Sequence, residues 1–144
     1  MSKVIAILDA AFAAIKVPAI AGVSVHRQRT FAVPSSAETA TINVKLGRKS
    51  PPILKTGPNT KSGVADRVTE LLVVITAHGD SALEEVERLS GEVVKRLFAD
   101  TTLGGACLDI EEFGAERNEA DTDGTLQMLT PVFHVKYRTT GDES

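Results

Sequence analysis

The sequence of 144 residues has one cysteine, no tryptophan and few aromatic residues, and each shortage disfavours a class of protein. Cys107 cannot form a disulfide within the chain, as is typical of proteins in reducing compartments. Single-strand nucleic-acid binders stack bases on aromatic side chains, and the aromatic content here is only 4%. No apolar run approaches the roughly 20 residues of a membrane span, and the amino-terminal pattern is not that of a signal peptide. We therefore expect a globular protein without a membrane segment.

The sequence also lacks the motifs of common catalytic and cofactor sites. It contains neither the Gly-x-Ser-x-Gly elbow of hydrolases nor a dinucleotide-binding fingerprint. The segment Gly57–Ser62 differs from a phosphate-binding loop, because threonine rather than glycine precedes its lysine. The histidines His26, His78 and His134 fall on three separate predicted strands, without the short spacing of metal ligands. We predict a protein that is not an enzyme and that binds no metal or cofactor.

The strongest structural signal lies between Arg67 and Phe98. Residues 67–78 are rich in β-branched side chains, and their apolar residues fall on both faces, which predicts a central strand covered on each side. From Ser81 the apolar residues recur every third or fourth position, which predicts an amphipathic helix with a Ser81–Glu84 capping box. The helix positions expected to face the core are Leu83, Val86, Leu89, Val93, Val94, Leu97 and Phe98.

Further apolar patterns predict a second helix and four more strands. The helix runs from residue 4 to about residue 16. The predicted strands cover residues 22–26, 41–46, 106–113 and 126–138. We expect Leu108 and Ile110 to point inward, Cys107 to be a small buried residue of the same strand, and Pro131 to mark an edge or a bulge. Together these elements predict one α+β domain over residues 1–144, with a mixed, mainly antiparallel sheet packed against two helices.

Residues 47–66 form a long stretch without periodicity. Prolines, glycines and basic residues mix in it, and a loop of this length in a compact domain is usually functional or disordered. We interpret it as a flexible basic arm that becomes ordered against a partner. Residues 140–144 are interpreted as a polar tail.

Charge is divided unequally along the chain, although the formal net charge is only −3. Residues 27–67 contain eight Lys or Arg and two acids, whereas residues 100–123 contain eight acids and one arginine. Such asymmetry is evidence about partners rather than about fold. The asymmetry has two equally good explanations. One is two independently solvated surfaces, and the other is an interface between copies of the chain. The residues expected at that interface are Arg48, Lys49, Lys55, Lys61, Glu111, Glu112, Glu116 and Asp121.

Several segments occur in an order that is shared with one protein family. They are an amino-terminal helix, Ile42–Gly47, a long helix ending in Leu97–Asp100, the Asp100–Gly105 turn, the strand Leu108–Glu112 with an acidic turn after it, and Leu129–Thr139. This series resembles the tail terminator family of long-tailed, siphovirus-like phages, most strongly from Arg67 onward. Residues 27–40 and 47–66 match no pattern of that family.

The resemblance implies a structural virion protein of which six copies close into a ring. In that family the ring caps the tail tube, ends its polymerisation and offers a surface to the head–tail connector, while genomic DNA passes through the lumen without specific binding. The implied location is the head-proximal end of the virion tail, after assembly in the host cytoplasm. A head–tail connector or a tail tube subunit would suit the same features, although a tube subunit should be more completely β. From a different class, a small enzyme or nucleotide-binding module is disfavoured by the missing site.

Overall fold

The computed structural model describes residues 3–28, 40–49, 53–54, 65–119 and 126–139. In chain order the elements are α1 (Lys3–Lys16), β1 (Val23–Arg27), β2 (Ala40–Lys49), β3 (Ile53–Leu54), β4 (Ala65–His78), α2 (Ala82–Phe98), β5 (Asp109–Glu119) and β6 (Leu126–Thr139). The predicted α+β class, with a mixed sheet and two helices, is confirmed. Neither helix is long and apolar enough to cross a membrane.

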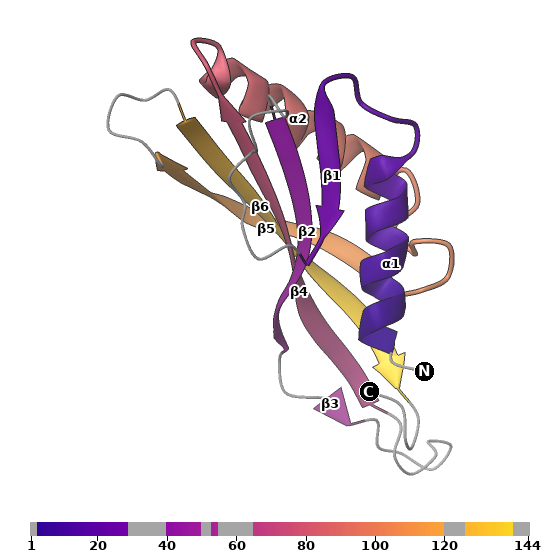
Figure 1. Ribbon diagram of the computed structural model, residues 1–144. Coiled ribbons are helices and arrows are strands. Elements are labelled where there is room, and N and C mark those ends of the chain that lie inside the picture. Colours follow the sequence, from indigo (N-terminus) through magenta and orange to yellow (C-terminus); the bar gives the residue numbers. More distant parts are fainter. Residues whose placement is uncertain (1–2, 29–39, 50–52, 55–64, 120–125, 140–144) are drawn as a thin grey trace.

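The strands form one sheet in the order β1-β2-β4-β6-β5, and the short β3 pairs with the start of β4 (Figure 1). The β1–β2 pair is parallel and all other neighbours are antiparallel. The stretch 67–78, predicted as the central strand, lies within β4, between β2 and β6. Its Leu71 is opposite Leu46 on one side and Phe133 on the other.

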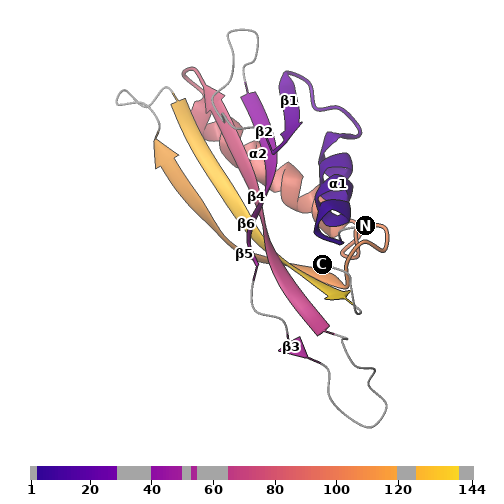
Figure 2. The same cartoon turned by 60° about the horizontal axis from the view of Figure 1, so that its bottom comes forward.

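Both helices cover the same face of the sheet (Figures 1 and 2). The helix α1 packs against β1 and β2, and α2 packs against β4 and β6. Their apolar stripes meet the inward side chains of the strands in a single core. The buried helix residues are Val4, Ile7, Leu8, Ala11 and Ile15 on α1 and Ala82, Val86, Leu89, Val93 and Leu97 on α2.

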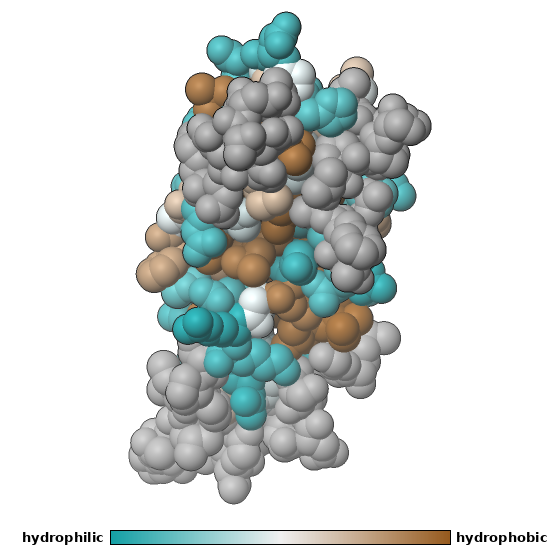
Figure 3. All heavy atoms as spheres, turned by 60° about the vertical axis from the view of Figure 1, so that its left-hand side comes forward, coloured by the Kyte–Doolittle hydropathy of each residue, from teal (hydrophilic) through white to brown (hydrophobic). Residues whose placement is uncertain are grey.

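The opposite face of the sheet is free of helices in the described part of the chain. Along β4, Leu71 and Val73 are buried under the helices, whereas the alternating Leu72 and Val74 are only partly buried. Figure 3 brings this side forward and shows apolar side chains interspersed with polar ones. For the described residues, the prediction of a strand covered on both sides is confirmed only near the end of β4, where Thr76 and its β2 neighbour Thr41 are buried on the helix-free face.

Two details predicted for α2 are wrong. The Ser81 side chain makes no capping hydrogen bond, and its backbone, with φ −102° and ψ 20°, is outside the β region typical of N-cap residues. Leu83 and Phe98, expected in the core, are 47% and 38% exposed. Both lie at the margin of the buried stripe. The Phe98 ring still meets Phe133 edge-on, with ring centroids 6.0 Å apart.

The strand predicted at 106–113 begins later, at Asp109. A turn precedes it, in which the Cys107 N–H donates to the carbonyl of Thr102 at 3.1 Å. Cys107 is buried, as expected, but in this turn rather than in a strand. Leu108 was expected to point inward and is 45% exposed, because it lies before the strand. Ile110 is buried as predicted.

Pro131 was predicted at an edge or bulge, but β6 lies inside the sheet, between β4 and β5. The β4–β6 pairing is interrupted between Leu72↔Val132 and Ile75↔Leu129, the interval that contains Pro131. The missing proline N–H is thus accommodated in a gap of the ladder. The irregularity of the neighbouring strand falls close by, between Glu112 and Gly114 of β5.

The stretch 47–66, predicted as one long loop, includes strand residues. Residues 47–49 end β2, residues 53–54 form β3, and residues 65–66 begin β4. The remainder of that stretch, the acidic turn at 120–124 and the tail 140–144 lie outside the described residues. The prediction of a single aperiodic arm is therefore wrong where strands are described.

Candidate assembly interface

One row of residues crosses the sheet at a single level, from the end of β2 to β5. The Arg48 backbone N–H donates to Glu70 Oε1 on β4 at 2.9 Å. Glu70 is opposite His134 on β6, and His134 is opposite Glu111 on β5. The end of β2 and the beginning of β5 therefore lie on opposite sides of the sheet, separated by β4 and β6.

The interface residues predicted from charge fall into two groups. Arg48 and Lys49 are exposed at the end of β2, and Glu111, Glu112 and Glu116 are exposed on β5. Within one chain these two groups do not meet, because they lie at opposite ends of the row. The other predicted residues, Lys55, Lys61 and Asp121, lie outside the described residues.

The strand β5 forms one edge of the sheet, since β6 is its only partner among the described strands. Its register shifts between Glu112 and Gly114, and Gly114 has a φ of +146°, which side-chain-bearing residues rarely adopt. Exposed acids and a bulge both discourage indiscriminate pairing at a strand edge. The β5 edge therefore suits a selective partner rather than any free strand.

Phe113, at the bulge, was not singled out from the sequence. Its side chain is 67% exposed, and its ring stacks on His134 with centroids 4.1 Å apart and planes inclined by 13°. His134 Nε2 in turn lies 3.9 Å from Glu70 Oε2. The sequence did contain a signal for this residue. Phe113 is an aromatic residue in an acidic strand, and alternation from the buried Ile110 places it on the face away from the helices.

The end of β2 extends beyond β1, whose pairing stops at Arg27↔Val44. After that point Gln28 turns back, with its N–H bonded to the Val44 carbonyl and its side-chain oxygen accepting from Leu46 N–H, both at 2.9 Å. With the Arg48 N–H bonded to Glu70, two backbone donors of this segment already have acceptors. The segment therefore offers mainly its side chains to a partner.

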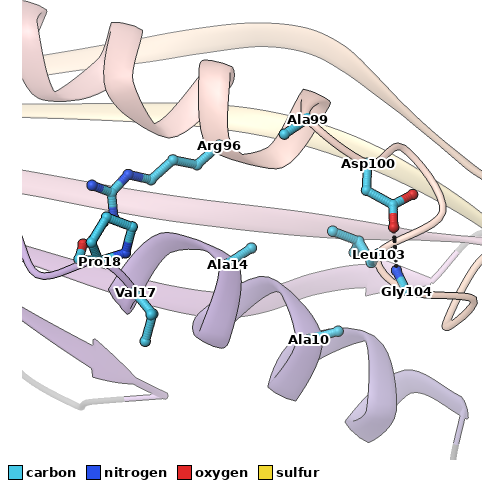
Figure 4. A pocket seen from close by; sticks show the side chains of 9 residues that line it. All are labelled: Ala10, Ala14, Val17, Pro18, Arg96, Ala99, Asp100, Leu103 and Gly104. Atoms are coloured by element: carbon cyan, nitrogen blue, oxygen red, sulfur yellow. Dashed lines mark hydrogen bonds between the residues drawn. The ribbon is translucent and has the colours of Figure 1, made fainter.

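A groove of about 510 Å³ lies on the helix side, between the end of α1 and the turn after α2 (Figure 4). Its two charged residues are already engaged. Arg96 donates to the backbone carbonyls of Ile15 and Pro18, and the Asp100 carboxylate accepts from Thr102 and Gly104. The hydrogen bonds from Thr102 and Gly104 lower the pKa of Asp100. These groups stabilise the helix ends and do not form a catalytic pair.

The described residues contain no reactive or metal-binding constellation. No group of three or more His, Cys, Asp or Glu among them could hold a metal ion. Burial, with smaller contributions from Asp109 and Asp100, raises the pKa of Cys107 to about 11. The thiol is therefore protonated near neutral pH and is a poor nucleophile.

Comparison with known proteins gives limited similarity. No family model matches the sequence, and no curated protein matches it. Among solved structures, the fold is similar to a chain from the virion of a native gene transfer agent particle. That match has a TM-score of 0.48 and 10% sequence identity, and it covers 90% of this chain and 84% of the other. A likeness at this level does not establish a shared function.

Proposed function

We propose that this protein is a structural component of a phage virion, and specifically a tail terminator that forms a ring on the finished tail tube. The observation that carries the proposal is the position of the two charged groups. Arg48 and Lys49 lie on one side of the sheet, and Glu111 and Glu112 lie at the same level on the other. Such a chain is complementary to a second copy of itself in a head-to-tail arrangement.

The strand directions are compatible with this arrangement. Because β4, β6 and β5 alternate, β5 runs in the same direction as β4 and opposite to β2. A neighbour in the same orientation would therefore bring the end of its β2 antiparallel to β5. A head-to-tail contact of this kind gives a closed ring when the rotation between copies closes, and a closed ring stops growing.

The proposed ring fits the role implied by the sequence resemblance. Six copies would cap the tail tube, end its polymerisation and present a second surface to the head–tail connector. The lumen would let genomic DNA pass without specific binding. The protein would then act by shape and contact, which agrees with the absence of a reactive constellation among the described residues.

A head–tail connector is the second candidate, since it is also a ring. A tail tube subunit fits less well, because it should be more completely β, whereas here α1 and α2 supply one layer of the core. An enzyme of unknown class is disfavoured by the protonated thiol of Cys107 and by the engaged charges of the groove.

Native mass spectrometry and electron microscopy of the purified protein test this function. We expect a species of about six times the 15.3 kDa chain mass, with a central hole in projection. Added to polymerising tail tubes, the protein should fix tube length, whereas tubes alone continue to grow. A chain that remains monomeric at all concentrations, with and without tubes, would contradict the proposal. A ring that binds the portal-side connector and leaves tube growth unchanged would favour the connector instead.

A further inference from the structure

We infer that Phe113 is the anchor of the contact between neighbouring copies, and that its open ring face receives the Arg48 guanidinium of the next copy. The inference rests on the ring of the proposed function and specifies its contact. It begins with the exposure of the Phe113 side chain, 67%, on a strand otherwise lined with acids. An isolated exposed aromatic residue needs no explanation, but this one is held in a defined position.

The Phe113 ring is held on one side only. One face stacks on His134 at 4.1 Å between centroids, and His134 is itself 3.9 Å from the Glu70 carboxylate. The bulge at Gly114 sets the local backbone that places the ring there. A pre-positioned aromatic ring loses little side-chain entropy on binding, which is a property of anchor residues at interfaces.

The surroundings of the ring select a cation. Glu111, opposite His134, and Glu116, which lines the same hollow as Phe113, are exposed on the face of the sheet that carries the ring, and no described residue forms an ion pair with them. A guanidinium can lie flat on an aromatic ring while its edge donates hydrogen bonds to carboxylates. An acidic rim around an aromatic face therefore fits arginine better than an apolar side chain.

Arg48 is the arginine that the sheet places at the right level. Its backbone N–H is bonded to Glu70, which shares the transverse row with His134 and Glu111. The pairing of β1 with β2 ends at Val44, just before Leu46. Leu46 lies in one row across the sheet with Leu71, Phe133 and Glu112, and the β5 bulge follows Glu112. The end of β1 and the bulge of β5 are therefore at nearly the same level.

Sedimentation of the full-length protein over a concentration series tests the anchor. Phe113→Ala should raise the dissociation constant for ring assembly by about tenfold or more, as expected for a central aromatic contact. Phe113→Leu should fall between Ala and the unmodified protein, because it keeps apolar contact and loses the cation–π term. Leu83→Ala is the matched control, since Leu83 is also exposed but lies on the helix side. Urea unfolding of each variant separates loss of assembly from loss of folding.

A double-mutant cycle with Arg48→Ala tests the pairing. If Arg48 binds Phe113, the double variant should assemble about as well as the weaker single variant. Fully additive losses would overturn the Arg48 assignment. Unchanged assembly of Phe113→Ala would overturn the anchor while leaving the proposed ring intact. Failure of the unmodified protein to form any oligomer, in contrast, would overturn the proposed function together with this inference.

Discussion

Arg96 on α2 donates a hydrogen bond to the backbone carbonyl of Ile15 near the end of α1, at 2.7 Å. The same guanidinium bonds to the carbonyl of Pro18 and to Glu92 one helical turn earlier. Arginine near a helix carboxyl terminus satisfies carbonyls that have no partner within the helix. One side chain thus joins the two helices that cover the sheet.

Replacing Arg96 by alanine should therefore lower the free energy of unfolding by about 2–3 kcal/mol, since charged hydrogen bonds to carbonyls of the α1 terminus are lost in a largely buried position. Arg88→Ala is the control, because Arg88 pairs with Glu85 on the exposed side of the same helix and should cost under about 1 kcal/mol. Urea denaturation followed by circular dichroism measures both. Equal losses would show that Arg96 does not join the helices.

Truncation along α2 should follow burial in the structure rather than the sequence pattern. Leu89→Ala removes a fully buried side chain and should cost about 2–5 kcal/mol. Phe98→Ala should cost less, because that ring is partly exposed although it meets Phe133. Leu83→Ala should cost less than about 1 kcal/mol. Thermal and urea unfolding measure these losses. Equal losses of unfolding free energy in Leu83→Ala and Leu89→Ala would contradict the orientation of α2.

The raised pKa of Cys107 predicts a loss of stability at high pH. In the unfolded chain the thiol ionises near its ordinary pKa of 9.0, whereas in the folded protein it ionises near 11. The folded state therefore binds this proton more tightly. The resulting contribution to the free energy of unfolding is fully present below pH 9 and is lost as the pH rises through 11.

Cys107→Ala provides the comparison that isolates this thiol. Other groups that titrate at high pH, such as Tyr137, are present in both proteins and cancel in the difference. The stability of the unmodified protein, measured by urea unfolding relative to Cys107→Ala, should decline between pH 8 and pH 10.5. A constant difference across that range would show that the thiol is not sheltered by folding.

Assembly should weaken with salt if opposite charges meet between copies. Exposed pairs contribute on the order of 0–1 kcal/mol each, but complementary fields speed association and fix the register, and a ring repeats the contact at every subunit. Lys49→Glu should weaken assembly further, and adding Glu112→Lys should restore part of the loss. Light scattering at several salt concentrations measures these changes.

The rival explanation places the acids on the lumen, where they would keep passing DNA from binding. In that case Glu112→Lys would give no rescue of Lys49→Glu, and rings of the Glu112→Lys variant would retain DNA. Salt-independent assembly together with absent rescue would exclude the pairing between subunits.

Local pattern was sufficient for most elements of this fold. The steps of three and four in residues 82–98 and the β-branched run in 67–78 determine a helix and a strand through periodicity and side-chain shape alone. Their apolar content also determined that both would reach the core. The sites of disagreement lie where a local rule competes with packing: Ser81 has a capping sequence but no side-chain bond, and Leu108 has an inward phase but precedes the strand.

Only the tertiary structure decided which residues share a surface. Nothing local relates Arg48, Glu70, His134 and Glu111, because they lie on four strands whose register is set by long-range pairing. The same pairing placed the β5 bulge at Phe113 at nearly the level where β1 stops pairing with β2, at Val44. The order of the described elements also left one face of the sheet without a helix. The division of charge was visible in the sequence. The placement of Arg48 and Lys49 at the end of β2, at the level of Glu111 and Glu112 on β5, required the sheet, because strand order and register are properties of pairing and not of any one segment.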